Sequence, residues 1–411
     1  MSNNNTNDDF NKDKKFLSMI LVFLILLSVN MRSPIVMIGS LADILNQSLG
    51  LSPLYLGYLG ALPLPLFALG ALITPRLIAN FGLMRLIVVV TTILTVAILL
   101  RVWAGMIGVF IGTFVLSLMI GILNVAIAPF VKQYLPNHIT IATGIFSLSM
   151  SVSAGFLAWL VVPLSKTLNW QFSLSVWAIF AALAVLIFII RIQKISQVND
   201  VFNQKTNQNL TINNGFQTHF LVWKNKMAWC LGVFFGLQSL LFYSVASFLS
   251  LVGVSYGLSN EQASVAVLVF QFAAPVAIFM MTALIKRNFS IKIIALTSAI
   301  CNAVGVFGLI VLPDFLYLWS AMMGFGGSAI FTLVLMLFSL KTSSLQAARD
   351  LSGMVQVVGY VIAFFGPLIV GKLYEKTGTW ELSLQVLFVL MCVNIGFGWL
   401  AGRGDKVDSQ C

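Results

Sequence analysis

The sequence predicts an all-α integral membrane protein with 12 transmembrane helices, built as two six-helix bundles that repeat one another in the same direction. Three observations predict this fold class. Of the 411 residues, 59% are hydrophobic and only 9% are charged, whereas a soluble domain carries about 25% charged residues. Apolar runs of membrane-spanning length recur along the whole chain, and short motifs of the first half return in the second half.

Twelve apolar runs approach or exceed the ~20 residues that a helix needs to cross the hydrocarbon core. They are apolar on all sides, as in helices that face lipid or lie fully buried. The interval 191–226 is rich in Asn and Gln, which predicts a flexible linker between an N-terminal bundle at 16–190 and a C-terminal bundle at 227–402. The runs lie at about 16–40, 54–78, 86–103, 107–130, 140–163, 170–190, 227–252, 262–285, 291–312, 315–340, 351–371 and 381–402.

The basic residues predict the orientation of these spans. With the N-terminus inside, 18 of the 23 Lys and Arg fall in inside segments, and Arg101, Lys166, Lys372 and Lys376 fall outside. Such a bias places the tails 1–15 and 403–411 and the linker in the cytoplasm. The net charge of +11 is therefore interpreted as a topology signal rather than as a nucleic-acid surface. We expect a multi-pass protein of the cell (inner or plasma) membrane.

The two halves share an internal repeat. Because each half has an even number of spans, both run in the same direction through the membrane, as in parallel-repeat transporters. The matching pairs are Gly50-Leu51-Ser52 with Gly257-Leu258-Ser259 at an offset of 207, Lys132 with Lys341 and Thr143-Gly144 with Ser352-Gly353 at 209, and Trp170 to Leu174 with Trp380 to Leu384 at 210.

Arg32 is the charge that lies deepest in an apolar run of this sequence. A charge at the bilayer centre costs about 2.5–3.5 kcal/mol, so it normally faces the protein interior or a polar pathway. Its rigid fork of donors suits planar anions and carboxylate- or nitro-like acceptors. We expect Arg32 to hold the cargo of a transporter; the alternative is that it snorkels to the headgroups or braces a helix carbonyl.

Several motifs resemble those of the cyanate/2-nitroimidazole permease family of major facilitators. Asn30-Met31-Arg32-Ser33-Pro34 is similar to the Asn-x-Arg-Pro signature of that family, with Ser33 inserted. The resemblance implies the major-facilitator fold, with the cargo site near the midplane between the halves. It extends to Asn124-Val125, Pro129, Lys132, Pro136 and Thr143-Gly144, to the stretch from Phe235 to Tyr243, and to Leu351 to Met354, Gly359-Tyr360 and Gly366-Pro367.

The repeat and helical spacing add further candidates for cargo binding. An offset of 207 maps Arg32 onto Ser239, beside Gln238, so the C-terminal half would contribute these two residues and Tyr243. Gln356 and Tyr360 are four apart and share one helix face. With Asn30 and Asn124, the candidate set is Arg32, Asn30, Asn124, Gln238, Ser239, Tyr243, Gln356 and Tyr360. For the Asn and Gln side chains of this set, the alternative to cargo binding is an interhelical hydrogen bond, which is worth about 0.6 kcal/mol.

The ionisable residues limit the mechanism. His138 and His219 fall in loops, and the 12 acidic residues fall in tails, loops or helix ends. A carboxylate proton relay is therefore not expected, which leaves uniport, anion exchange, or proton coupling carried by the cargo itself.

These features predict a transporter, not an enzyme. We expect a monomer that carries a small molecule, anionic or with cyanate- or nitro-like acceptors, and uses no cofactor, metal or nucleic acid. The first alternative is an exporter of a neutral or lipophilic cargo. A membrane-embedded enzyme, which would need a nucleophile–base pair or metal cluster at depth, or a sensor is a more remote one.

Overall fold

The computed structural model describes residues 3–41, 45, 48–49, 59, 62–192 and 222–403, which are almost entirely helical. Within those ranges, 12 helical segments are long and apolar enough to cross a membrane, as the sequence predicts. In the N-terminal half the helices are α1 (Asn3–Ser40), α4 (Pro63–Phe81), α5 (Leu83–Trp103), α6 (Gly105–Tyr134), α7 (Ile139–Thr167), α8 (Trp170–Ser175) and α9 (Ala178–Ile187), with the short turns η1 (Pro136–His138) and η2 (Phe188–Ile192). In the C-terminal half they are α12 (Lys226–Ser255), α13 (Asn260–Lys286), α14 (Ile291–Val311), α15 (Leu316–Leu340), α16 (Leu345–Thr377) and α17 (Glu381–Ala401), with the turn η3 (Pro313–Phe315).

The helix boundaries differ from the predicted runs where polar residues continue a helix. α1 begins at Asn3, so most of the predicted tail 1–15 is helical. Extending an existing helix avoids the cost of nucleating a new one. α16 begins at Leu345, six residues before the predicted 351, because the Ser344 hydroxyl accepts a hydrogen bond from the Ala347 N–H at 3.0 Å and caps the helix. Residues 42–44, 54–58, 193–221 and 404–411, which include Asp43, His219 and most of the predicted linker, lie outside the described residues.

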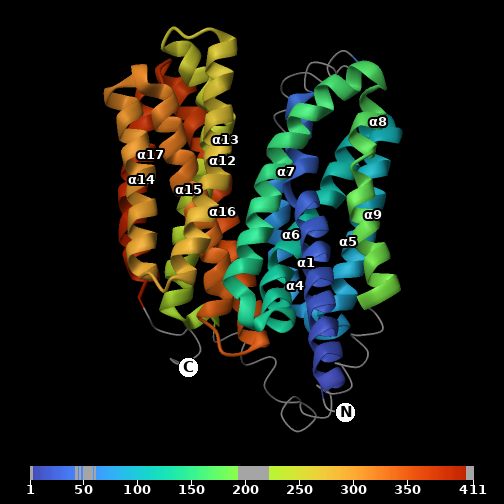
Figure 1. The fold of residues 1–411 in the computed structure, drawn as a ribbon. Helices are drawn as coiled ribbons and strands as arrows, with labels where there is room; N and C mark the ends of the chain where they lie inside the picture. Colours follow the sequence, from blue (N-terminus) through green and yellow to red (C-terminus); the bar gives the residue numbers. More distant parts are fainter. Residues whose placement is uncertain are drawn as a thin grey trace.

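The helices form two groups side by side (Figure 1), with α1 to α9 in one and α12 to α17 in the other. α1 begins and α17 ends at the same end of the molecule, the lower end in Figure 1. The two groups are the parallel-repeat bundles that the sequence predicts. They meet through α4 against α16, α7 against α13, and α6 against α15 and α16.

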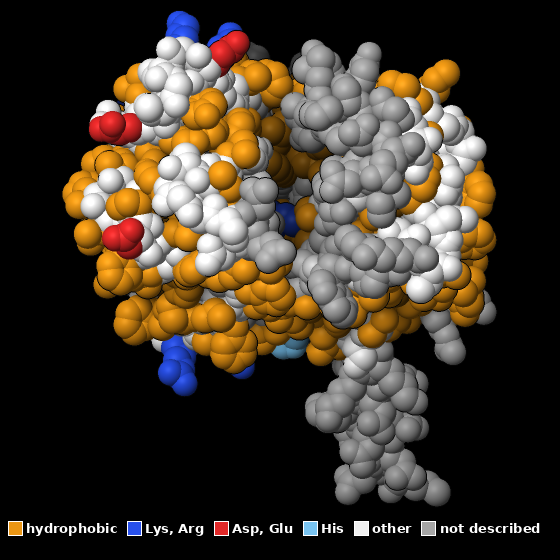
Figure 2. Space-filling model, turned by 90° about the horizontal axis from the view of Figure 1, so that it is seen from above, with side chains coloured by type: hydrophobic (Ala, Val, Ile, Leu, Met, Phe, Trp, Pro, Cys, Tyr) orange, Lys and Arg blue, Asp and Glu red, His pale blue; other side chains and the backbone are white. Residues whose placement is uncertain are grey.

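The outer surface is apolar, as a lipid-facing surface must be. On one face of α13, for example, Phe279 is 73% exposed and Phe272 and Val276 are also exposed. A soluble protein rarely exposes contiguous apolar surface of this extent. The space-filling view of the upper end shows this apolar surface around the described part of the molecule (Figure 2).

The bundles pack most closely near the lower end, and glycines permit the contact. A Cβ on Gly353 of α16 would lie 2.7 Å from the Cγ of Pro75 and 3.2 Å from the carbonyl of Ala71, both on α4. Gly144 of α7 packs in the same way on Thr282 of α13, where a Cβ would lie 2.9 Å from the threonine Cγ2. Gly144 and Gly353 are repeat partners at the offset of 209, so the repeat places equivalent close contacts at both bundle seams.

Candidate functional site: a cavity between the bundles

A cavity of about 730 Å³ lies between the two bundles. Figure 2 looks down from the upper end and shows the molecule hollowed between the bundles, with a basic side chain inside the hollow. Helices of both bundles line it, and its polar lining residues are Arg32, Arg101, Thr113, Asn124, Gln238, Ser239, Tyr243, Ser247, Gln271 and Tyr360. No Asp, Glu or His is among the described residues that line it.

Arg32 projects from α1 toward the C-terminal bundle. Its Cζ lies 4.3 Å from the ring centroid of Phe242 on α12 and 5.8 Å from that of Phe331 on α15. These cation–π contacts hold the guanidinium without using its N–H groups as hydrogen-bond donors. Over the ranges that the structure describes, Arg32 forms no hydrogen bond or ion pair, so neither of its alternative roles, snorkelling or bracing a carbonyl, is seen.

The predicted residues of α12 lie on the same cavity. Gln238 and Ser239 are buried, and the Ser239 hydroxyl donates a hydrogen bond to the Gln238 Oε1 at 3.1 Å. Tyr243, one helical turn from Ser239, also lines the cavity. Arg32 and the region to which the repeat maps it therefore face one space from opposite bundles.

Asn124 and Tyr360 join the two bundles at the deep end of the cavity. The Asn124 Nδ2 of α6 donates a hydrogen bond to the Tyr360 hydroxyl of α16 at 3.3 Å. The Tyr360 ring packs against Phe67 and Phe235, with centroid distances of 5.2 and 5.6 Å. The tyrosine is thus held by aromatic contacts from both bundles, and it lines the cavity.

Two predicted site residues do not line this cavity. Asn30 is buried and its amide donates a hydrogen bond to the Leu26 carbonyl of its own helix at 2.8 Å. Gln356 is also buried, and its Nε2 donates to the Asn124 carbonyl at 3.2 Å and to the Ser352 hydroxyl at 2.9 Å. Both amides therefore form hydrogen bonds within or between helices, which is the alternative to cargo binding for Asn and Gln side chains.

Arg101 lines the cavity but was not among the predicted site residues. The sequence places Arg101 in an outside segment at the end of its predicted helix, and the structure adds that its side chain is only 3% exposed, in the last turn of α5. Its Nη1 donates a hydrogen bond to the Pro34 carbonyl of α1 at 2.6 Å. The depth of a charge within an apolar run, which identified Arg32, is a weak signal for Arg101, because Arg101 lies only two residues from the end of its run. Thr113, Phe242 and Phe331 were missed because nothing in the sequence distinguishes them from ordinary core residues.

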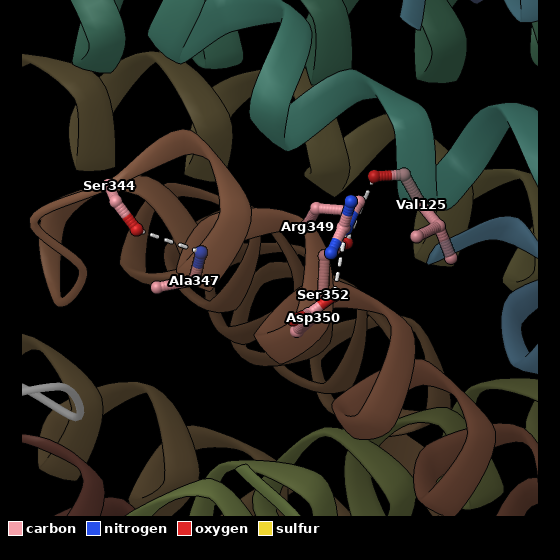
Figure 3. Close-up of polar contacts among 6 residues, drawn as sticks. All are labelled: Val125, Ser344, Ala347, Arg349, Asp350 and Ser352. Carbon is pink, nitrogen blue, oxygen red and sulfur yellow. Dashed lines mark hydrogen bonds and ion pairs between the residues drawn. The ribbon is translucent and has the colours of Figure 1, made fainter. Parts of the chain in front are cut away.

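Below the cavity, polar contacts close the seam between the bundles. The Lys132 Nζ of α6 donates to the Ser339 carbonyl at 2.9 Å, to the Thr342 hydroxyl at 3.0 Å and to the Thr342 carbonyl. The Ser352 hydroxyl of α16 donates to the Val125 carbonyl of α6 at 3.2 Å (Figure 3). The cavity is consequently closed toward the lower end.

Asp350 belongs to this closed region. It is fully buried inside α16, and its Oδ1 accepts a hydrogen bond from the Arg349 Nε at 2.8 Å (Figure 3). The apolar run predicts a helix that begins at 351, just after Asp350, whereas α16 begins at Leu345 and includes Asp350. Within the described ranges, no group of three or more His, Cys, Asp or Glu side chains could hold a metal ion.

Comparison with known proteins agrees with this geometry. The sequence pattern that describes the Major Facilitator Superfamily matches residues 18–342 of the chain. The chain belongs to the major facilitator superfamily. It is accordingly a multi-pass membrane protein with the fold of small-molecule transporters, and the superfamily membership predicted from the motifs is confirmed.

Individual relatives support the narrower resemblance. The 2-nitroimidazole transporter of Escherichia coli (strain K12) is 28% identical over 368 residues, covering 89% of this chain and 91% of the relative. The cyanate transport protein CynX of the same strain is 23% identical over 388 residues, covering 92% and 97%. A solved structure of the proton:xylose symporter XylE superposes with a TM-score of 0.77 at 11% identity, covering 96% of this chain and 98% of XylE, and supports the fold alone.

Proposed function

We propose that this transporter carries a small molecule that is anionic or bears cyanate- or nitro-like acceptors, and that Arg32 binds the acceptor group. The observation that carries the proposal is the position of Arg32: its guanidinium faces a cavity between the bundles, and no acidic side chain is among the described residues that line it. A positive charge without a protein counter-ion favours an anionic or electron-rich partner. Gln238, Ser239, Tyr243, Asn124 and Tyr360 would supply the neutral polar contacts.

The relatives fit this class of cargo. Cyanate is a small anion, and a nitro group carries partial negative charge on two coplanar oxygens. Both match the planar fork of donors that a guanidinium presents. At identities of 28% and 23% pocket residues can change while the fold persists, so the proposal names a class of cargo.

The distribution of Lys and Arg supports a cell-membrane protein with both termini in the cytoplasm. In that orientation the cavity opens away from the cytoplasm and the closed seam lies on the cytoplasmic side. Transport would then proceed by alternating access of two bundles, 16–190 and 227–402, around a fixed site. We propose a monomer that works without nucleic acid and without an enzymatic step.

A second candidate is export of a neutral or lipophilic cargo. Aromatic rings from both bundles favour it, since Phe67, Phe242, Phe331, Tyr243 and Tyr360 all line the cavity. Such rings also bind lipophilic cations through their faces. The two arginines of the cavity oppose a cationic cargo.

A thermal-stability screen of the purified protein distinguishes these candidates. The probes are cyanate, benzoate, 2-nitroimidazole and the lipophilic cation tetraphenylphosphonium. We expect at least one anionic or nitro-bearing probe to raise the melting temperature, since a ligand at 100 times its Kd stabilises by about 2.7 kcal/mol. The shift should disappear in Arg32→Gln. Stabilisation by the cation alone would contradict the proposal.

A further inference from the structure

Arg101 is a second buried cation at the wall of the cargo cavity. Its side chain is 3% exposed and lies where α5 meets α1 and α6. Gly112 of α6 makes the room, because a Cβ there would lie 2.6 Å from the Arg101 Cα. An arginine with its backbone packed this closely against a neighbouring helix has a fixed place in the fold.

Its hydrogen-bonding groups are only partly used. Nη1 donates to the Pro34 carbonyl, whereas the buried Nε has no partner among the described residues. No ion pair of Arg101 is found over those residues either. A buried charge that lacks an oppositely charged partner is costly, as shown by the strong destabilisation that follows when one partner of a buried ion pair is removed. A buried guanidinium that has no counter-ion among the described residues carries its positive charge beside the adjacent cavity, where little water screens it.

The contact with Pro34 ties Arg101 to the position of Arg32. Pro34 has no N–H, so the Asn30 carbonyl one turn earlier lacks its usual helical donor and α1 is weakened there. Arg32 lies two residues before Pro34. A hydrogen bond from α5 to the Pro34 carbonyl fixes this weakened turn and, with it, the direction from which Arg32 enters the cavity.

We propose that Arg101 is a positioning and specificity residue of the cargo site: it fixes the turn of α1 that carries Arg32 and makes the cavity doubly positive, so that it favours anions over neutral molecules of the same shape. This inference rests on the proposed function for its cargo. The charge that it assigns to the cavity can be measured without any cargo.

The test uses a cysteine reporter in the cavity. Ser247 lines the cavity and is exposed, so Ser247→Cys, made after replacing Cys230, Cys301, Cys392 and Cys411 with Ser, offers a single thiol. Its reaction rates with anionic methanethiosulfonate ethylsulfonate and with cationic methanethiosulfonate ethyltrimethylammonium are compared. The ratio of the two rates reports the local potential, because effects on thiol ionisation cancel.

The variants separate charge from packing. Arg101→Gln keeps a donor for the Pro34 carbonyl but removes the charge, and Arg101→Lys keeps the charge. We expect Arg101→Gln to lower the anion-to-cation ratio at least threefold, and Arg101→Lys to keep it within about twofold of the parent. Arg85→Gln, an exposed residue at the other end of α5, serves as the matched control and should leave the ratio unchanged.

An unchanged ratio in Arg101→Gln overturns the inference, whatever Arg32→Gln does. An equal fall in Arg101→Gln and Arg101→Lys also overturns it, because packing rather than charge would then be responsible. Failure of the proposed function looks different: no anionic or nitro-bearing probe would stabilise the parent protein, while the reporter ratio would still fall in Arg101→Gln.

Discussion

Arg32 and Arg101 show how far sequence alone can locate the residues of a buried site. Arg32 lies inside a long apolar run, and its desolvation cost marks it as a candidate for the site. Arg101 lies two residues from the end of its helix, where the sequence cannot distinguish an interior side chain from a headgroup-level one. Only the packing of α5 against α1 and Gly112 decides that it points inward.

The hydroxyl of Tyr360 gives a prediction at this scale. Tyr360→Phe keeps the ring contacts with Phe67 and Phe235 and removes the hydrogen bond with Asn124. We expect normal insertion and a two- to tenfold weaker affinity for the best-binding probe, as one neutral hydrogen bond is worth about 0.5–1.5 kcal/mol. The affinity is measured from the rise in melting temperature as the probe is titrated. An unchanged affinity would show that the hydroxyl serves only the seam between the bundles.

At the scale of the helices, residues related by the internal repeat lie at the seam between the two bundles, but their contacts there are not always the same. The Gly144 and Gly353 partners each pack on the opposite bundle, which explains why small residues occur at both positions. The lysine partners differ, since Lys132 reaches across the seam to α15 whereas Lys341 donates to the Arg403 carbonyl within its own bundle. Residues at equivalent positions of the repeat can thus make different contacts, and the sequence repeat alone does not predict which of them reach the other bundle.

Gly353→Ala tests the role of this seam. A Cβ would press on Pro75 and the Ala71 carbonyl, so we expect the lower end to close poorly and the outward-open population to fall. The measurement is the reaction rate of Ser247→Cys with an impermeant reagent added from outside, which should drop severalfold. Gly155→Ala is the control, because a Cβ on Gly155 meets nothing within 4 Å. Equal rates in the two variants would refute a gating contact at Gly353.

For the whole molecule, composition and run length were sufficient to predict the twelve spans, since a bilayer imposes length and hydrophobicity on every span, and the recurring motifs predicted the parallel repeat. The helix ends were predicted less well, because a single cap such as Ser344 moves a boundary by a turn or more. Six of the eight predicted site residues line the cavity; Asn30 and Gln356 do not, because a buried amide can bond to a carbonyl of its own helix, as Asn30 does, or of a neighbouring helix, as Gln356 does.

The charges of the cavity predict its response to pH. No Asp, Glu or His is among the described lining residues, so no lining group there normally titrates between pH 6 and 8. We expect uptake of a non-titrating anion into proteoliposomes to vary less than about twofold over this range and to ignore an imposed pH gradient. Accumulation that follows a pH gradient and is lost in Asp43→Asn would contradict this expectation.

Uptake by Arg32→Gln in proteoliposomes tests the cargo site most directly, compared with the parent protein and with Arg85→Gln as a control for charge loss elsewhere. A charged hydrogen bond to cargo is worth about 1.5–3 kcal/mol, so we expect at least a tenfold loss of apparent affinity or of uptake in Arg32→Gln. Arg85→Gln should transport normally. Parent-like uptake with unchanged affinity in a correctly inserted Arg32→Gln protein would contradict the assignment of Arg32 as the cargo-binding residue.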